Sequence, residues 1–357
     1  MSNFDLSSLA LRSAFPTNSL ICDDTQLPSV MVFIPKFKMS DVIDGGSDST
    51  HPAFIVDGVE KDGIYISKYQ NIVREANPYS LPGEDPATSV NFDNAFNYCA
   101  TKGQGWHLMT AMEWGAISLW CKKNGHLPYG NNNNGKDTKE TLRKAIPSYI
   151  DENGIVMRTA TGTGPVEWSH NKQADGIYDL NGNVWEWNSG IRLLNGELQI
   201  LENNNAANRV NSQSSNSTHW RAIDGTTGDL IIPNTIGSTP YSIKLDLVDG
   251  KWTWITGAIS TQGEADTKFV NVASTGLCEK AKELLYALGL LPHDTGDYGT
   301  APLHANNTIN VVTPNELMLF SGGASSTGGS TGLFRRVFLY KRINGADTVG
   351  FRSAYYE

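Results

Sequence analysis

The sequence predicts an α+β fold that is rich in loops, with short mixed sheets and two or three helices. Apolar residues recur at helical spacing in the segments that begin at Asn91 and Thr110. Apolar and polar residues alternate with the period of a strand over residues 241–248. The 35 glycines and 9 tryptophans of this 357-residue chain suit indoles that are buried beneath irregular segments.

The first elements are a terminal segment, a strand and a helix. Residues 1–29 are polar with apolar interruptions, and we expect them to form an N-terminal arm for attachment or oligomerisation. Residues 30–34 predict the first strand of the fold. In the helix that begins at Asn91, the i, i+3, i+4, i+7 spacing predicts one buried face, formed by Phe92, Ala95, Phe96 and Cys99.

Two further helices follow. Thr110 and Glu113 have the spacing of a capping box and predict a helix that ends at residues 122–125. This helix is apolar nearly all round, so we expect it near the centre of the molecule. Residues 275–288 predict another helix, stopped by Gly289 and Pro292. Its inward positions are expected to be Leu277, Ala281, Leu284 and Leu288.

The segment 176–187 reads G-I-Y-D-L-N-G-N-V-W-E-W. Asn181-Gly182 predicts a tight turn, because glycine accepts positive φ and asparagine tolerates it. Spacing alone favours a hairpin with Trp185 and Trp187 on one side of the exiting strand. We expect both indoles to be structural, and at least one of them to be fully buried.

Two other segments are rich in turns. Residues 188–275 mix polar loops with strands and predict an insertion, decorated with a hairpin in which Asp249-Gly250 joins residues 241–248 to 251–255. Residues 130–135 read G-N-N-N-N-G. Amide oxygens there would suit a cation, but the segment has no carboxylate and a solvated loop is the favoured interpretation.

Composition excludes several classes of protein. The net charge of −9 argues against general nucleic-acid binding, which needs a basic surface. We expect no membrane insertion, because no apolar run approaches the roughly 20 residues of a membrane span. Residues 1–20 lack a cationic and an apolar region, so we expect no signal peptide. The four cysteines do not form a disulfide framework and are expected to be reduced, with Cys99 and Cys121 inside helices as small core side chains.

The segment 176–187 closely resembles the signature of the formylglycine-generating-enzyme family, which has a C-type-lectin-like fold. Four more segments resemble family motifs in the same order: 63–69, 86–95, 107–114 and 349–352. The resemblance implies one C-type-lectin-like domain over residues 30–357.

The chemistry of that family is not expected here. Its oxidases hold copper with a late pair of cysteines, whereas no cysteine follows Cys278. The iron-binding H-x-x-x-H-x-E helix of related sulfoxide synthases is also missing. Three glutamates beside tryptophans have local explanations, as a helix cap for Glu113 and as strand positions for Glu167 and Glu186. We therefore expect no catalytic residue, no metal and no cofactor.

Residues 321–354 resemble the variable region of diversity-generating retroelement proteins, which display a mutagenised ligand-binding face on a C-type-lectin fold. Positions that match the fixed framework of such regions are Gly322, Gly323, Gly328, Gly332, Leu333, Phe334, Arg342, Gly350, Phe351 and Arg352. Positions that depart from the Asn-rich template fit mutagenesis of adenines, except Lys341, which an AAC codon cannot yield. The resemblance implies a ligand-binding set made of Ala324, Ser326, Thr327, Ser330, Arg335, Val337, Leu339, Tyr340, Ile343, Gly345 and Ala346.

Strand alternation does not decide which side of residues 334–340 faces outward. One side carries Phe334, Arg336, Phe338 and Tyr340, and the other carries Arg335, Val337 and Leu339. The resemblance favours Phe334 and Phe338 as framework and Arg335, Val337, Leu339 and Tyr340 as displayed. A solvated surface is the default for the cations Arg335, Arg336, Lys341 and Arg342. Because they alternate with aromatic residues, a binding hot spot is the second interpretation.

The function expected is that of a non-enzymatic receptor-binding protein of a phage or prophage tail, with a diversified C-terminal face. The alternatives are a degenerate oxidase or oxygenase of the formylglycine-generating type, and a structural virion protein. The partner would be a protein or glycan receptor on a host or target cell surface, and the chain would form a homo-oligomer in some assemblies. The expected location is the virion tail, or the cytoplasm before assembly.

Overall fold

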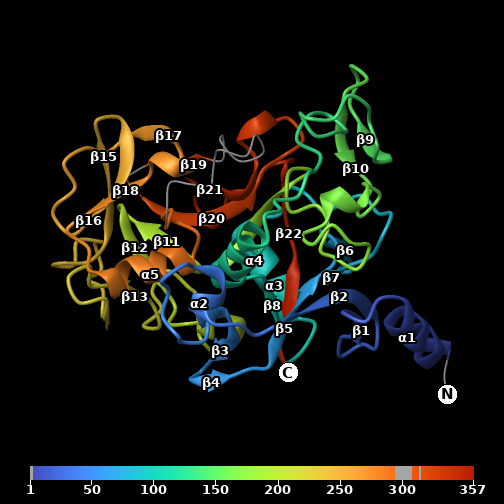
Figure 1. Ribbon diagram of the computed structural model, residues 1–357, viewed down its shortest axis with the longest axis horizontal. Helices are drawn as coiled ribbons and strands as arrows, with labels where there is room; N and C mark the ends of the chain where they lie inside the picture. The colour runs from blue at the N-terminus through green and yellow to red at the C-terminus, as the bar shows by residue number, and fades with distance from the viewer. Residues whose placement is uncertain (1–2, 294–307, 313–314) are drawn as a thin grey trace.

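The computed structural model in Figure 1 describes residues 3–293, 308–312 and 315–357. It contains α-helices of four to thirteen residues, none of them long and apolar enough, in the described part of the chain, to cross a membrane. The helices are α1 (Asn3–Ala14), α2 (Met39–Val42), α3 (Phe92–Ala100), α4 (Ala111–Lys123) and α5 (Glu279–Ala287). Short 3-10 helices are η1 (Pro52–Phe54), η2 (Val166–Trp168), η3 (Asn205–Ala207), η4 (Phe269–Asn271) and η5 (Gly328–Ser330).

The smaller of two main sheets has the strand order β1-β2-β5-β23-β8. Its strands are β1 (Asn18–Cys22), β2 (Pro28–Pro35), β5 (Gly63–Ser67), β23 (Ser353–Tyr355) and β8 (Trp106–Leu108). β23 pairs with both β5 and β8, so segments from opposite ends of the sequence share this sheet.

The larger sheet has twelve strands within the described residues. Nine of them follow the order β17-β19-β21-β20-β11-β12-β15-β16-β18. Of the other three, β13 pairs with β12 and β14, and β22 pairs with β11. Their bounds are β11 (Trp185–Leu194), β12 (Glu197–Ile200), β13 (Arg221–Ile223), β14 (Leu230–Ile231), β15 (Lys244–Val248), β16 (Lys251–Ile255), β17 (Glu264–Lys268), β18 (Ala273–Thr275), β19 (Thr308–Val312), β20 (Glu316–Gly322), β21 (Gly332–Tyr340) and β22 (Val349–Phe351). Three two-stranded ribbons join β3 (Ile55–Val56) to β4 (Val59–Glu60), β6 (Ile72–Arg74) to β7 (Asn77–Tyr79) and β9 (Pro147–Ile150) to β10 (Val156–Thr159).

Both capped helices are confirmed. α3 follows Asn91, whose side chain accepts a hydrogen bond from the Asn94 amide at 2.8 Å. α4 follows Thr110, and reciprocal bonds between Thr110 and Glu113 complete the capping box. α4 is buried on nearly every side, as its apolar sequence predicts, and Figure 1 shows it near the middle of the molecule.

The third predicted helix is shorter than residues 275–288. α5 starts at Glu279, after the N-cap Cys278. The residues before it form β18, which pairs in parallel with β16. Gly276 then turns the chain with a φ of 75°, a conformation that glycine adopts readily. Sheet pairing therefore takes the residues that helical periodicity had assigned to the first turn.

The predicted N-terminal arm has regular structure. α1 leads into β1, the edge strand of the smaller sheet, which pairs antiparallel with β2. Lys68 Nζ donates a hydrogen bond to Asn18 Oδ1 at 2.6 Å and lies 4.8 Å from the centre of the Phe15 ring. These contacts bind the segment into the sheet. Its role in attachment or oligomerisation stays a prediction.

The segment 188–275 supplies most of β11 and all of β12 to β18. Its predicted hairpin is confirmed: β15 and β16 pair antiparallel, and both Asp249 and Gly250 have positive φ in the turn between them. These strands continue the large sheet. The assignment of the segment as an insertion stays a prediction.

The turn at Asn181-Gly182 does not close a hairpin. Gly182 has a φ of 82°, as a tight turn requires, but the described segment that leads into the turn contributes an isolated bridge between Ser169 and Tyr178 and no strand that pairs with β11. After the turn, β11 pairs with β20 on one edge and in parallel with β22 on the other. Trp187 is fully buried, as predicted for at least one indole, and its Nε1 donates to the Val90 carbonyl at 2.8 Å.

The loop at residues 130–135 is not solvated, contrary to the favoured prediction. Asn131 and Asn132 are buried, and Asn131 Oδ1 accepts a hydrogen bond from the Gly135 amide at 2.7 Å. A carboxylate from outside the run, Asp137, accepts bonds from the Gly130 amide and the Asn132 side chain. The polar side chains therefore satisfy one another, which allows the loop to pack beneath its neighbours.

Two core clusters lie against the large sheet. The main one surrounds Trp114 of α4 and includes Phe334 and Phe338 of β21. The second lies beneath α3 and includes Trp187 and Val337. β21 therefore has apolar contacts on both faces, and this decides which residues near the C-terminus reach the surface.

Candidate ligand-binding face

β21 carries four of the residues predicted to bind ligand, but it is an internal strand. It pairs with β20 on one edge and in parallel with β19 on the other. Arg335 and Val337 are buried, at 5% and 1% exposure, and Ala324 beyond the start of the strand is 2% exposed. The prediction that these three side chains are displayed is wrong, because Val337 packs in the second core cluster and Arg335 and Ala324 are buried as well.

A bulge in β21 changes the predicted sides of the strand. Phe320 pairs with Val337 while Met318 pairs with Tyr340, so β21 has one residue more than β20 over this stretch. Tyr340 thereby moves to the face of Val337, and strand alternation had placed it with Phe334. Its ring stacks on Phe320 with centroids 5.2 Å apart. Tyr340 and Leu339 are half-buried.

An aromatic row crosses three neighbouring strands at this face, from Trp185 on β11 through Phe320 on β20 to Tyr340 on β21. The Trp185 and Phe320 rings meet edge to face with centroids 5.3 Å apart. Trp185 is half-buried, so one side of its indole reaches the surface. Sequence reasoning gave Trp185 a purely structural role. The spacing of two tryptophans could not show that β20 leaves one of them partly uncovered.

Arg335 lies beside this row. Its guanidinium carbon is 5.7 Å from the centre of the Trp185 ring, and its Nη1 donates to Asp266 Oδ1 at 2.6 Å. Burial lowers the pKa of Arg335, and the charge and hydrogen bond of Asp266 partly oppose this. Asp266 is on β17, two strands away across β19, and no pattern in the sequence links it to Arg335. Arg335 thus contacts the Trp185 end of the row and is itself held by Asp266.

The first loop of the face covers residues 324–331. Ser326 is exposed, and Thr327 and Ser330 are half-buried. The loop is held by its backbone: the Gly328 amide donates to the Asn132 carbonyl, and the Asn134 amide donates to the Ser325 carbonyl, both at 2.8 Å. A side chain at position 323 would collide with Thr331, which explains the framework glycine there.

The second loop covers residues 341–348, where Ile343 is 69% exposed, Gly345 is exposed and Ala346 is half-buried. Arg342 anchors it, because Nε and Nη2 donate to the two oxygens of Glu316 and Nη1 donates to Asp93 at 2.9 Å. Burial opposes the charge of Arg342, but Glu316 and Asp93 outweigh it and raise its pKa. A framework role for Arg342 agrees with these contacts.

The remaining framework residues are buried. Arg352 and Glu186 form a paired, two-bond contact in the core, and Phe334, Phe338 and Phe351 are each at most 1% exposed. Arg336 is fully buried beside Trp114, with hydrogen bonds to Ser321 Oγ and to the Leu333 and Leu288 carbonyls. Its burial lowers its pKa to about 9. Arg336 belongs to the core, so it fits neither the solvated surface nor the binding hot spot that were considered for the four cations.

The predicted binding residues therefore fall into two surface groups at opposite ends of β21. Gly332 at the start of β21 pairs with Gly322, and Tyr340 at its end pairs with Met318, so the two ends of β21 are separated by four residues of β20, or roughly 13 Å. The first group is Ser326, Thr327 and Ser330. The second is Leu339, Tyr340, Ile343, Gly345 and Ala346, and the aromatic row reaches this group at Tyr340. We refer to these residues with Trp185 as the terminal face.

The glutamates and cysteines have structural surroundings. Glu113 Oε1 lies 2.8 Å from His107 Nε2 and accepts a bond from Asn204, in addition to its capping role. Glu167 is exposed on η2 and is not on a strand, contrary to prediction. Cys99 and Cys121 are fully buried as predicted, and burial raises the pKa of both thiols. The described residues hold no group of three or more His, Cys, Asp or Glu side chains that could bind a metal ion.

Comparison with known proteins places this chain among its relatives. The family model described as a sulfatase-modifying factor enzyme 1-like domain matches residues 28–218. No curated protein matches the sequence.

Two solved structures are similar to this chain over most of its length. PvdO from Pseudomonas aeruginosa is 14% identical, with 95% of this chain and 98% of that chain covered and a TM-score of 0.40. The Treponema denticola variable protein 1 is 11% identical, with 96% of this chain and 100% of that chain covered and a TM-score of 0.35. The family match covers more than half of the sequence and agrees with the α+β fold, its short mixed sheets and its loops. The chain therefore belongs to the family of sulfatase-modifying factor enzyme 1-like domains, with their C-type-lectin-like fold.

Proposed function

We propose that this chain is a non-enzymatic ligand-binding protein with a diversified C-terminal face, as in the receptor-binding protein of a phage or prophage tail. The observation that carries the proposal is a separation of roles within residues 321–354. Framework positions make buried contacts, as Arg352 does with Glu186. Eight of the eleven residues predicted to bind ligand lie on the terminal face, and the other three are buried.

The loops can vary because their backbone holds them in place. The Ser89 amide donates to the Ala346 carbonyl at 2.9 Å, and the Asn91 side chain donates to the Ile343 carbonyl. Replacing the side chains of Ile343 or Ala346 leaves these bonds intact. A rigid scaffold that carries exposed loops is a common way to combine stability with a changeable binding site.

The chemistry of the face suits a receptor on a cell surface. The second group offers Leu339, Tyr340 and Ile343 as apolar anchors, and Trp185 supplies an indole held next to a guanidinium. Half-exposed aromatic side chains of this kind are enriched at binding hot spots. The small polar residues of the first group, Ser326 to Ser330, would add hydrogen-bonding groups at the other end of the face.

The experiment is a pair of randomised libraries, displayed and sorted for resistance to protease. One library varies Ser326, Tyr340, Ile343, Gly345 and Ala346, and its matched control varies five buried positions, Phe334, Arg336, Val337, Phe338 and Arg352. We expect most members of the first library to fold and few members of the control. Sequences of sister isolates should differ mainly within residues 324–348. Equal tolerance of the two libraries, or uniform drift among isolates, contradicts the proposal.

The rival function is an oxidase or oxygenase of the same family. Protein purified without added metal and measured by mass spectrometry distinguishes the two functions. A stoichiometric content of copper or iron would contradict the non-enzymatic part of the proposal. The library experiment would then still test whether the terminal face tolerates diversification.

A further inference from the structure

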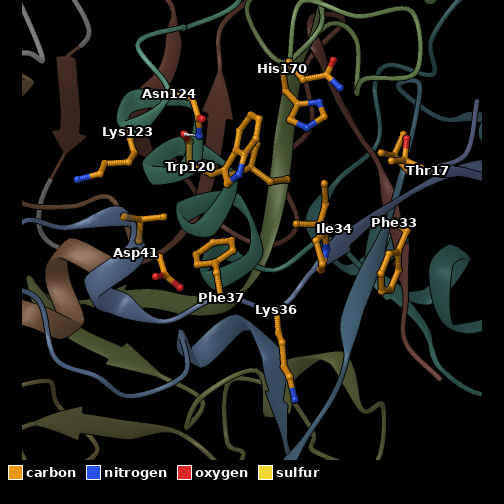
Figure 2. A pocket seen from close by; sticks show the side chains of 15 residues that line it. Thr17, Phe33, Ile34, Lys36, Phe37, Asp41, Trp120, Lys123, Asn124 and His170 are labelled. Atoms are coloured by element: carbon orange, nitrogen blue, oxygen red, sulfur yellow. Dashed lines mark hydrogen bonds between the residues drawn. The ribbon is translucent and has the colours of Figure 1, made fainter.

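A cavity of about 420 Å³ lies between β2, α2, α4 and the loop at residues 170–171. Figure 2 shows Trp120, Phe37 and His170 around this space. None of its lining residues belongs to residues 321–354. The cavity is therefore separate from the terminal face, and the proposed function does not use it.

The side chain of His170 gives the cavity a hydrogen-bond donor whose direction is fixed by a second hydrogen bond on the same ring. Its side chain is 5% exposed, and its Nδ1 accepts a hydrogen bond from the Ile177 amide at 2.9 Å. Burial lowers the pKa of His170 to about 3, so the ring is neutral near pH 7 and carries its single proton on Nε2. Within the part of the chain that the structure describes, this Nε2 has no hydrogen-bond partner, and His170 lines the cavity.

Trp120 forms the neighbouring wall. Its ring centre is 5.3 Å from that of His170, and it is half-buried at the edge of α4. Its indole N–H has no hydrogen-bond partner among the described residues either. Two residues that carry an unpaired N–H thus line one cavity, and an acceptor supplied by a ligand would satisfy the buried donor of His170.

The rest of the lining is apolar at the base and charged at the rim. Buried side chains at the base include Val32, Ile34 and Ile117. Both rim lysines already have carboxylate partners, since Lys36 Nζ lies 2.7 Å from Glu60 and Lys123 Nζ lies 2.5 Å from Asp44. The cavity therefore offers aromatic and aliphatic surface with N–H donors, and its cations are already neutralised.

We propose that this cavity binds a small uncharged ring compound that carries a carbonyl oxygen. The ring would contact Trp120 and Phe37, and the oxygen would accept a hydrogen bond from His170 Nε2. A mostly apolar cavity with a few placed polar groups is the usual form of a small-molecule site, and such sites measure about 300–1,000 Å³. This volume does not accommodate a folded partner, which supports a small molecule as the occupant.

The test is a titration of the full chain with acetophenone, followed by the indole N–H signals in a ¹⁵N correlation spectrum. Trp120→Phe assigns the Trp120 signal, which should shift on titration. Ethylbenzene has the ring without the oxygen and should bind about fivefold more weakly. Benzoate, which adds a charge, should also bind more weakly than acetophenone.

Two variants decide the role of the donors. His170→Phe keeps an aromatic ring but removes the N–H, and it should weaken acetophenone binding about fivefold. His219→Phe, at an exposed position outside the cavity, is the matched control and should bind like the parent. If His170→Phe does not fold, Trp120→Leu replaces it and should weaken binding by a similar factor. Equal binding of acetophenone and ethylbenzene, or unchanged affinity in the folded variant, overturns the proposal.

Discussion

Arg352 and Glu186 form a bidentate ion pair in the interior, with Arg352 Nε 2.6 Å from Glu186 Oε2 and Nη2 2.7 Å from Oε1. Both side chains are at most 1% exposed. Arg352 also donates to the Ser67 and Tyr178 carbonyls. One guanidinium therefore joins the G-F-R end of the sequence, the tryptophan-containing turn and the smaller sheet.

Breaking this pair should destabilise the protein strongly. Glu186→Gln leaves the Arg352 charge buried without a carboxylate, and removing one partner of a buried pair costs roughly 3–5 kcal/mol. The free energy of unfolding in urea measures the effect. Lys36→Ala, which removes the exposed partner of Glu60, should cost less than about 1 kcal/mol. A Glu186→Gln variant as stable as Lys36→Ala would show that the pair does not hold these segments together.

The two tryptophans of β11 should respond differently to truncation. Trp187 is fully buried between Phe92 and Phe320, so Trp187→Ala should cost roughly 3–5 kcal/mol in urea unfolding. Trp185 is half-buried, so Trp185→Ala should cost less and should change target binding, which Trp187→Phe should not. Equal losses of stability in the two alanine variants would contradict the difference in burial.

Acid should destabilise the protein partly through His51. This side chain caps η1, where Nδ1 accepts a bond from the Ala53 amide, and burial lowers its pKa from 6.5 to about 3. The unfolded chain takes up this proton near pH 6.5, whereas the folded chain does so only near pH 3. The stability is therefore fully present above pH 6.5 and is lost as the pH falls toward 3.

His51→Asn keeps an oxygen acceptor for the cap and removes the titrating ring. Between pH 6 and pH 4, the pH dependence of the unfolding free energy should be smaller in this variant by about 1.4 kcal/mol per pH unit. His219→Asn, at an exposed position, serves as the control. The same slope in His51→Asn and in the parent would mean that His51 titrates alike in the folded and unfolded chains.

Local signals in the sequence predicted the elements that local interactions determine. The caps at Asn91 and Thr110 are determined by hydrogen bonds to residues three positions away. The Asp249-Gly250 turn is determined by the positive φ of its own two residues. The burial of Trp187 followed from the motif around it. These features need no knowledge of distant strands.

The exposure of β21 could not be predicted in this way, because it depends on pairing with β19 and on contacts from β17. Nothing near Val337 in the sequence indicates that residues 308–312 lie beside it. A bulge then reversed the side of Tyr340, since one extra residue shifts the alternation of every side chain that follows. The cavity at His170 was missed for a similar reason, as its walls come from four separate segments.

The resemblance had assigned both Arg335 and Tyr340 to the displayed residues, but Arg335 is buried and Tyr340 is half-buried. Arg335→Ala leaves Asp266 without its partner and removes a buried side chain that contacts Trp185, so it should cost roughly 1–3 kcal/mol of stability. Tyr340→Ala removes a half-exposed ring from the edge of the second cluster and should cost less. Thermal unfolding of the single variants measures both. Equal stability of Arg335→Ala and the parent would show that the ion pair with Asp266 contributes nothing.

Binding of the host receptor should instead depend on the exposed end of the face. Tyr340→Ala and Ile343→Ala should each weaken attachment of the purified protein to host cells, by more than about 2 kcal/mol if they are hot spots. The matched controls are Tyr241→Ala and Ile232→Ala, at 64% and 80% exposure on the segment 188–275. They remove the same side chains from another surface and should leave attachment unchanged. Because Ile343 is 69% exposed, its loss should hardly alter the melting temperature, so weaker attachment could not be ascribed to unfolding. If the control variants lose attachment as much as Ile343→Ala does, the receptor does not bind through the terminal face.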